Sequence, residues 1–362
     1  MMRMVCIQNK TLYLLLITLA VAGAAIPGHA QQDMLRLRLN VGTVSLNKLV
    51  NWVAYEEGLY KKNGLDVQQG MSRSGAADIK KLTGYDVPSQ YILGDAGPYA
   101  EAMTPDGRNP ISIGGGSPNI VRQVTTARTI RTVIILTTED KTRWPIIARK
   151  DITKPEQLKG KRLGYTNYGT TSHYQATLFA KRMGWDPIQD ISLMGGVSYL
   201  DPLRDLRDGV IDAFVSGEMA TYKAIGEGYK LLVETTKWNE PMASNGVNVD
   251  RAWLQNNREV ARRLVKSMVE AIAMMKKDKQ VAYRAMAKYY GIAKPEAQAY
   301  FYAQVENMPS KPYPAVAGIK KTLEVFQSVA GNEIRKHKPE DFYDDSFVRE
   351  LDEIGYIDSL YE

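Results

Sequence analysis

The sequence predicts an α/β fold of two lobes, which are joined by two extended crossings and completed by a helical C-terminal region. Apolar runs that end in glycine or polar turns alternate with amphipathic stretches, which indicates largely parallel sheets covered by helices. This alternation occurs once before residue 145 and again after it. The chain of 362 residues also exceeds what one hydrophobic core usually supports. These three observations together favour two lobes.

The elements expected for the first lobe follow from these runs in order. They are a strand at 35–41, a helix at 46–57, a strand at 65–68, apolar strand-like runs at 91–97 and 111–119 that each end in a glycine-rich turn, and a strand at 132–136. An extended crossing at 144–148 then leads into the second lobe.

The second lobe repeats the pattern and returns through a second extended piece at 246–249. Its expected elements are strands at 161–165, 191–194, 210–215 and 230–234, with helices from about 167 to 183, at 199–207 and at 219–227. We therefore assign 31–144 and 246–362 to lobe 1 and 145–245 to lobe 2.

Beyond the second crossing the pattern is almost wholly helical. Asn257 is a candidate N-cap for a helix whose apolar side chains recur every three or four residues through Met275. We interpret this stripe, methionines included, as core packing and not as a metal-binding surface. Pro295 is expected to open a further helix, and Pro309 to Pro314 to interrupt the helical region.

The N-terminus has the pattern of a cleavable signal peptide. Arg3 and Lys10 precede an apolar run at 12–26, and small residues at Gly28 and Ala30 predict cleavage before Gln31. The run is too short for a spanning helix, so we expect a periplasmic protein. The only cysteine, Cys6, precedes cleavage, and the mature chain would thus have no disulfide and no catalytic thiol.

Charge and composition narrow the class of partner. Residues 1–30 contain two basic residues and no acidic one, so the rest of the chain carries a formal charge of +5. Its basic residues are dispersed, and the run at 335–338 lacks interleaved aromatic residues, which argues against nucleic-acid binding. No closely spaced set of His, Cys and carboxylates predicts a metal site, and no cofactor is expected.

Polar and small residues gather where the predicted strands end, and in open α/β sheets ligands bind beyond the carboxyl ends of the strands. Turn chemistry alone also enriches these residue types, so only their shared placement points to a pocket. The candidate ligand-binding residues are Thr43, Ser45, Asn47, Asp95, Gly116, Ser117, Asn167, Thr170, Thr171, Ser172, Gly196, Glu218 and Asn245.

The segment 158–187 is the strongest of these candidates. A short strand there turns into a helix through Asn167, Gly169 and three hydroxyl residues, and Gly184 is a plausible helix stop. Unpaired N–H groups at such a start favour an anion. The alternative is that Thr170 or Thr171 merely caps the helix. Aromatic residues such as Tyr165, Tyr168 or Trp144 would either line the pocket or pack in the core.

Catalytic signatures are mostly missing. Pro155 replaces the first glycine of a phosphate-binding loop around Gly160 and Lys161, so the chain is not itself an ATPase. Asn119 stands where a nucleophile elbow around Ser117 would need its second glycine. A hydrolase using Ser117 with His173 or His337 remains an alternative, and His173 itself would either touch ligand or face solvent.

Several segments, taken together, resemble the periplasmic substrate-binding proteins of nitrate/sulfonate/taurine-type ABC importers. They are LKGKRLG at 158–164 with Gly169, Thr170 and Thr171, then EGLYKKNGLDV at 57–67, LRDGVIDA at 206–213 and DFYD at 341–344. The family includes relatives of proteins that bind thiamine-pyrimidine precursors. The likeness covers nearly all of the mature chain but is blurred between Ser74 and Pro110.

The resemblance implies a type II periplasmic binding protein that closes around a hinge. Such a receptor captures a small anion, of the sulfonate, nitrate, taurine or carboxylate class, and delivers it to a membrane permease with a separate ATPase. It implies a monomer without enzymatic turnover, with Thr43, Ser45, Asn167, Thr170 and Thr171 in the pocket. Some relatives synthesise the thiamine pyrimidine, but they look cysteine-rich near their site, whereas this mature chain has no cysteine.

Overall fold

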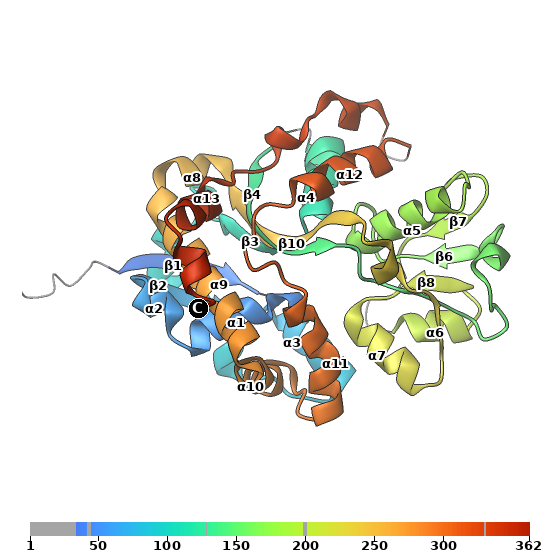
Figure 1. The fold of residues 1–362 in the computed structure, drawn as a ribbon, viewed down its shortest axis with the longest axis horizontal. Coiled ribbons are helices and arrows are strands. Elements are labelled where there is room, and N and C mark those ends of the chain that lie inside the picture. The colour runs from blue at the N-terminus through green and yellow to red at the C-terminus, as the bar shows by residue number, and fades with distance from the viewer. Residues whose placement is uncertain (1–33, 42–44, 128, 198–200, 329–330) are drawn as a thin grey trace, which may run out of the picture. The chain divides into compact units, whose positions relative to one another are not determined.

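The computed structural model describes residues 34–41, 45–127, 129–197, 201–328 and 331–362. Residues from Met34 to Glu362 form one compact unit, which contains two five-stranded sheets (Figure 1). The expected signal peptide and its cleavage site lie outside the described residues. Within the described ranges, none of the helices combines the length and the apolar character that a membrane span requires.

The first sheet has the strand order β2-β1-β3-β10-β4. Strand β1 pairs in parallel with β2 and β3, whereas β10 lies antiparallel between β3 and β4. The strands are β1 (Leu35–Asn40), β2 (Leu65–Gly70), β3 (Ile111–Gly114), β4 (Thr132–Lys141) and β10 (Pro241–Asp250).

The extended piece at 246–249 is therefore not a free crossing, because it forms the middle of the first sheet. Val247 stands opposite Ile113 on one side and Leu136 on the other. The expectation of a largely parallel sheet is corrected for the same reason, since β10 brings antiparallel pairing. The chain passes between the sheets at 142–145 and again at 234–240.

The second sheet has the order β7-β6-β8-β5-β9. Strand β6 is parallel to β7 and β8, and β5 is antiparallel to β8 and β9. The strands are β5 (Ile146–Ala148), β6 (Arg162–Gly164), β7 (Ser192–Met194), β8 (Ala213–Val215) and β9 (Leu231–Val233). Helices α5 (Thr171–Arg182), α6 (Pro202–Arg207) and α7 (Glu218–Gly226) lie around it (Figure 1).

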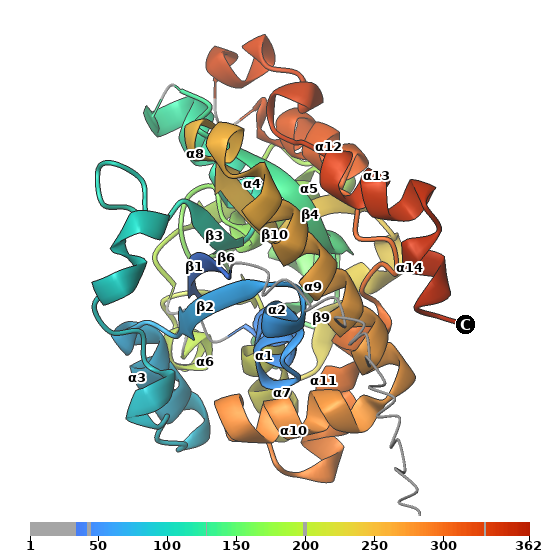
Figure 2. The same cartoon turned by 90° about the vertical axis from the view of Figure 1, so that its left-hand side faces the viewer.

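The remaining helices belong with the first sheet. They are α1 (Leu49–Glu56), α2 (Leu59–Lys62), α3 (Arg73–Thr83), α4 (Gly116–Arg122), α8 (Arg251–Asn256), α9 (Arg258–Lys277), α10 (Lys279–Tyr290), α11 (Pro295–Glu306), α12 (Val316–Phe326), α13 (Ser346–Glu353) and α14 (Tyr356–Ser359). Figure 2 shows α1, α2 and α9 side by side next to β1 and β2. The apolar stripe predicted after Asn257 is buried along α9, which confirms its core role.

The region between β2 and β3 differs from the expectation of a strand at 91–97. Short 3₁₀ turns at 89–91 and 97–102 replace it, and Ile92 makes only an isolated bridge with Met71. Apolar side chains alone suggested the strand, but Tyr91 and Ile92 are only half-buried against the core, where Tyr91 stands edge-on to Tyr289 and to Trp52. An irregular segment thus packs apolar side chains against the core without forming a paired strand.

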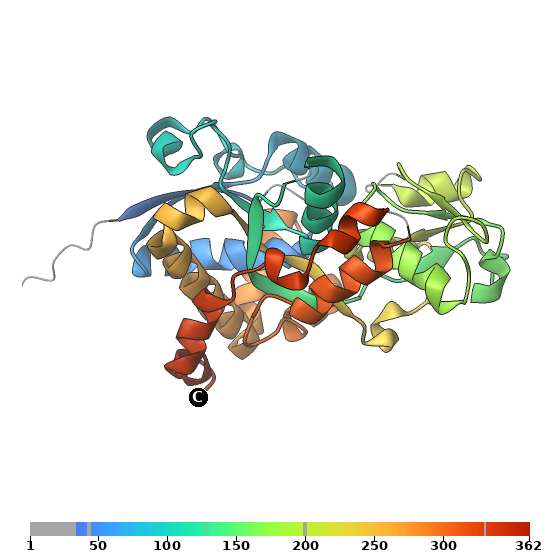
Figure 3. The same ribbon diagram turned by 90° about the horizontal axis from the view of Figure 1, so that it is seen from above.

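Helices α4 and α12 pack on β10 and also meet α5, next to which Figure 3 shows them. Tyr174 and Leu178 of α5 share one buried cluster with Val121 of α4 and Phe326 of α12. The second sheet's longest helix is thereby anchored on elements of the first sheet.

Candidate ligand-binding site

A cavity of about 460 Å³ lies where strands of both sheets end. Its walls come from the segment after β1, the exit of β3, strand β10 and the turn after β6. The strands β1, β3 and β6 reach it with their carboxyl ends, which is the edge where open α/β sheets bind ligands. Five residues predicted from the sequence line it: Ser45, Asn47, Thr170, Thr171 and Asn245.

The turn after β6 carries a hydroxyl cluster formed by Thr166, Thr170 and Ser172. The Thr166 and Ser172 hydroxyls are 2.9 Å apart, and Thr170 Oγ1 is 3.0 Å from Ser172 Oγ. Ser172 Oγ also accepts from the Thr166 backbone N–H at 3.0 Å. Ser172 is fully buried and positions the other two hydroxyls, which line the cavity.

Thr170 is both a cap and a lining residue. It is the N-cap of α5, and its hydroxyl oxygen accepts from the His173 N–H at 3.4 Å while donating to the Asn167 carbonyl at 2.6 Å. The alternative of a capped helix is therefore confirmed for Thr170, without removing the residue from the cavity wall. Helix α5 spans Thr171–Arg182, and Gly184 adopts positive φ, as the sequence predicted.

Charged side chains give the cavity a partly cationic lining. Lys48 and Arg122 face it from the first sheet's side, together with the half-buried Asp78 of α3. Burial lowers the pKa of Lys48 to about 8, while the negative charge of Glu218 raises it. A neighbouring anion would favour the charged form of this lysine.

Asn245 and Asn47 connect β10 to the segment after β1. The Asn245 side chain donates to the Asn47 carbonyl at 3.0 Å and to the Thr138 hydroxyl at 2.9 Å. Asn245 is buried, so these two bonds fix its orientation at the cavity wall.

Glu218 lies at the exit of β8, and its carboxylate reaches across to the segment after β1. Its Oε1 accepts from the Ser45 hydroxyl at 2.6 Å and from the Leu46 N–H at 3.0 Å. Glu218 lines a neighbouring cavity of about 220 Å³ that also contains Glu139, Arg143 and Glu234. Trp144 lines both cavities.

Four predicted residues lie elsewhere or outside the described chain. Asp95, Asn167 and Gly196 are exposed, and none of them lines the 460 Å³ cavity. Their backbone groups hold turns instead: the Asp95 carbonyl accepts from Gln68, and the Gly196 N–H donates to the Thr166 carbonyl. Thr43 falls outside the described residues.

Gly116 and Ser117 lie in the packing between α4 and β10. A Cβ on Gly116 would come 2.8 Å from Ile134 and 3.1 Å from Ala243, so the glycine serves a close approach. Ser117 is fully buried, donates to the Ala243 carbonyl at 2.9 Å and bonds the Thr322 hydroxyl at 2.9 Å. Their proximity to the strand exit made them candidates, but the side of α4 on which they stand faces the core.

His173 neither lines the cavity nor faces solvent. It is buried and stacks on Tyr165 at 4.3 Å between ring centroids, with Phe326 edge-on to it. Its Nδ1 accepts from the Gly169 N–H at 3.1 Å. Burial lowers the pKa of His173 to about 4, so the ring is neutral at physiological pH.

Sequence reasoning missed several lining residues, notably Lys48, Arg122 and Thr166. The signal for Lys48 was its spacing of three residues from Ser45 at a helix start, which brings both to one side. Thr166 stands two residues after Gly164, the last residue of β6, and this position is itself a strand exit. Arg122 gave no local signal, because α4 ends there and only the tertiary fold turns its last residue towards the cavity.

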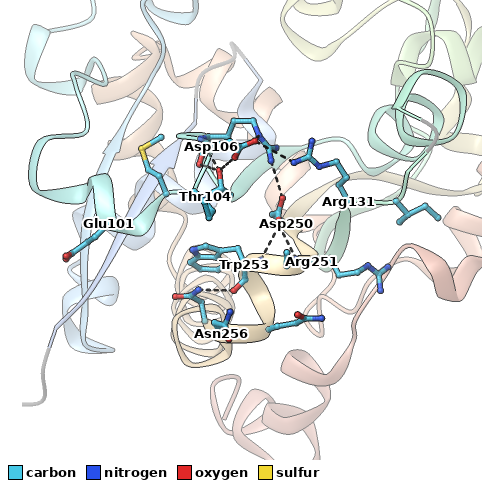
Figure 4. Close-up of a pocket in the computed structure, with 15 residues that line it drawn as sticks. Glu101, Thr104, Asp106, Arg131, Asp250, Arg251, Trp253 and Asn256 are labelled. Atoms are coloured by element: carbon cyan, nitrogen blue, oxygen red, sulfur yellow. Dashed lines mark hydrogen bonds and ion pairs between the residues drawn. The ribbon is translucent and has the colours of Figure 1, made fainter.

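Another cavity, of about 740 Å³, lies at the opposite end of the first sheet's strands, where β10 ends (Figure 4). Four of its charged side chains pair with one another: Arg108 bonds Asp106 at 2.7 Å and lies 3.6 Å from Asp250, and Arg131 lies 3.7 Å from Asp106. Asp250 in turn caps α8 through the N–H groups of Ala252 and Trp253. We therefore place the candidate site in the smaller cavity, where strand exits meet.

The chain is similar to known proteins in sequence and in fold. The model of the NMT1-like family matches residues 36–290. No curated protein sequence matches the chain. The fold is that of two-domain periplasmic binding proteins, as predicted.

Solved structures similar to the chain include the nitrate-binding protein NrtA from Synechocystis PCC 6803, with a TM-score of 0.65 and 12% identity over 91% of each chain. The aliphatic sulphonate binding protein SsuA from Escherichia coli has a TM-score of 0.59 and 15% identity, over 86% of this chain and 99% of that one. The desulfurization enzyme DSZB shares the fold with a TM-score of 0.56 and 15% identity, over 89% of this chain and 99% of its own. The fold thus accommodates binding proteins and an enzyme.

Proposed function

Because the chain belongs to the NMT1-like family, we propose that it is the substrate-binding protein of an ABC importer. It captures a small anion in the periplasm, in the 460 Å³ cavity, and delivers it to a membrane permease served by a separate ATPase. It carries out no catalytic turnover. The sequence-based lobes, 31–144 with 246–362 and 145–245, are the two bodies that close on the ligand.

One observation carries this proposal: hydroxyl and amide groups from strand exits of both sheets converge on one cavity beside two cationic side chains. Ser45, Asn47 and Lys48 come from the first sheet's side, and Thr166 and Thr170 from the second. Hydroxyl and ammonium groups are donors that suit a carboxylate, sulfonate or nitrate. A ligand held from both sides couples occupancy to closure around a hinge.

The enzyme alternatives receive less support. A hydrolase using Ser117 would need an accessible hydroxyl, whereas Ser117 is fully buried and its single proton goes to the Ala243 carbonyl. His173 is held by Gly169 and the aromatic rings around it. Neither residue can present a reacting atom to the cavity in this arrangement.

A thermal-shift screen of the mature protein tests the proposal. We expect one class of small anion to raise the melting temperature in a saturable manner, since a ligand that binds only the folded state stabilises it. Sodium chloride at equal ionic strength is the control. The proposal is wrong if the protein is folded and no anion stabilises it, or if the protein consumes the candidate ligands catalytically. Native mass spectrometry of protein purified without refolding would identify a co-purified ligand.

The threonines at the start of α5 provide a second test. Thr170→Ala with Thr171→Ala should weaken binding of the anion found in that screen by about tenfold or more. The Thr171 hydroxyl lines the cavity, and a hydroxyl bond to a charged group contributes about 1.5–3 kcal/mol, while Thr170 holds the helix start in place as its cap. Calorimetry measures the affinity. Ser72→Ala is the matched control, because Ser72 caps α3 by accepting from the Gly75 N–H at 3.0 Å and does not line the cavity. Equal affinity in all three proteins would reduce the threonines to caps.

A further inference from the structure

The contact between Glu218 and the segment after β1 uses the donors that an anionic ligand would need there. A serine hydroxyl has one proton, and the Ser45 hydroxyl donates it to Glu218 Oε1 at 2.6 Å. The Leu46 N–H donates to the same oxygen at 3.0 Å. Ser45 can therefore donate to a ligand only after Glu218 has left.

The surroundings hold these donors in place independently of Glu218. The Ser45 carbonyl accepts from the Tyr290 hydroxyl at 3.3 Å, and Ser45, Leu46 and Lys48 are all buried. Lys48 lies near enough to Glu218 for their charges to attract. The two donors and the nearby ammonium group thus form a carboxylate cradle, which we define as Ser45, Leu46 and Lys48.

We propose that Glu218 is a tethered carboxylate that occupies this cradle and competes with the anionic group of the ligand. This inference rests on the proposed function and adds to it how the site is regulated. Glu218 begins α7, on the second sheet's side, so the same carboxylate also bridges the two sheets. Displacing it frees the cradle and breaks that bridge in one step.

The position of Glu218 makes the competition internal to the site. Ser45 lines the 460 Å³ cavity and Glu218 the 220 Å³ cavity, so their hydrogen bond lies between the two. A ligand anion that replaces the carboxylate would gain charge-assisted hydrogen bonds from the same donors. The apparent affinity is then reduced by the fraction of molecules in which Glu218 holds the cradle.

Acetate is the probe that tests this without knowledge of the natural ligand. Glu218→Ala should vacate the cradle, and acetate should then raise the melting temperature in a saturable manner by about 2–4 °C, relative to chloride at equal ionic strength. The wild type should show no such rise. Glu234→Ala, which removes an exposed glutamate lining the same 220 Å³ cavity, is the matched control and should behave as the wild type does.

Adding Ser45→Ala to Glu218→Ala should abolish the acetate response, which locates it in the cradle. If Glu218→Ala does not fold, Glu218→Asp withdraws the carboxylate by one methylene and should give a response of the same sign. A response to acetate that is equal in wild type, Glu218 variants and Glu234→Ala would overturn the proposal. The acetate test does not depend on the natural ligand, so the two proposals can fail separately. If the wild type binds an anion in the screen but Glu218→Ala does not respond to acetate, only the proposal that Glu218 competes for the cradle is refuted. If Glu218→Ala responds to acetate but the wild type binds no anion in the screen, only the proposed transport function is refuted.

Discussion

At the scale of single residues, Glu139 shows how burial next to the site shifts a titration. The pKa of Glu139 is raised to about 7, chiefly by burial and also by the charge of Glu218, while the hydrogen bond from Ser244 at 2.7 Å opposes this rise. The ionised form is thus disfavoured in the folded protein. Glu139 therefore contributes stability below its unfolded value of 4.5, and this contribution is lost as pH rises through about 7.

We predict that Glu139→Gln changes the pH dependence of stability. The variant should be about as stable as the wild type near pH 4.5 and more stable at pH 8, by about 1–3 kcal/mol, because an amide has no charge to desolvate. Urea unfolding across this range measures the difference. Glu234→Gln, which makes the same substitution at an exposed glutamate of the same cavity, is the matched control. A constant offset between wild type and Glu139→Gln would argue against the raised pKa.

His173 should act in the opposite direction. Its pKa is lowered to about 4 by burial, so the folded protein loses stability as pH falls from 6.5 towards 4, where the unfolded chain binds the proton first. His173→Gln should flatten this acid-side slope. His337, which is half-buried beside Asp341, offers the comparison variant His337→Gln, which should leave the slope caused by His173 in place.

The residues of the site were predictable only where their signal was local. Ser45, Thr170 and Thr171 stand directly after strands or at a helix start, and this placement is visible in the sequence. The partnership of Ser45 with Glu218 joins residues 173 positions apart. No local pattern encodes it, because it depends on how two sheets are brought together.

At the scale of elements, periodicity predicted many of the regular helices and strands, but it missed the helices α3 and α4 and failed where backbone pairing is irregular. Helix α9 follows its apolar stripe, whereas the run at 91–97 packs as loops. Gly70 explains part of this: a Cβ there would come 2.7 Å from the Leu93 nitrogen, so the loop's backbone lies directly on the end of β2. The insertion of β10 between β3 and β4 likewise follows from long-range pairing, which composition does not reveal.

Helix α12 packs so closely on β10 at Gly318 that an alanine there should destabilise the protein and not stabilise it. Gly318→Ala would normally stabilise a helix by about 1 kcal/mol. A Cβ on Gly318 would instead come 2.2 Å from the Met242 carbonyl carbon and 2.3 Å from the Ala243 nitrogen on β10. We expect the free energy of unfolding of Gly318→Ala to fall by about 1–3 kcal/mol or more, because the backbone at this contact must move to make room for the Cβ. Chemical denaturation measures the change.

Gly226→Ala is the matched control for that substitution. Gly226 is the last residue of α7, is exposed, and would place a Cβ in open space. The free energy of unfolding of Gly226→Ala should equal that of the wild type or exceed it by up to about 1 kcal/mol. If Gly318→Ala were as stable as Gly226→Ala, the close packing of α12 on β10 would be wrong.

At the scale of the whole molecule, one buried cluster ties the second sheet's helix α5 to α4 and α12. Leu178 and Tyr174 of α5 lie in it with Val121 and Phe326. The first connection between the sheets is also tied to α5, because the Gln175 amide bonds both the N–H and the carbonyl of Trp144, at 3.2 and 2.7 Å. The second connection is bonded to the first, because the Thr235 hydroxyl donates to the Trp144 carbonyl at 2.9 Å.

Because this buried cluster joins helices of both sheets, we predict that the two sheets unfold as one cooperative unit. Leu178→Ala should lower the free energy of unfolding by about 2–5 kcal/mol. It should also lower the hydrogen-exchange protection of both α9 and α7, because the amides of both helices exchange through the same global unfolding. Val210→Ala, which changes an exposed side chain, should leave both helices as they are. Hydrogen exchange read by mass spectrometry resolves the two segments. A loss of protection confined to the second sheet would mean that the lobes unfold separately and that α5 does not couple them.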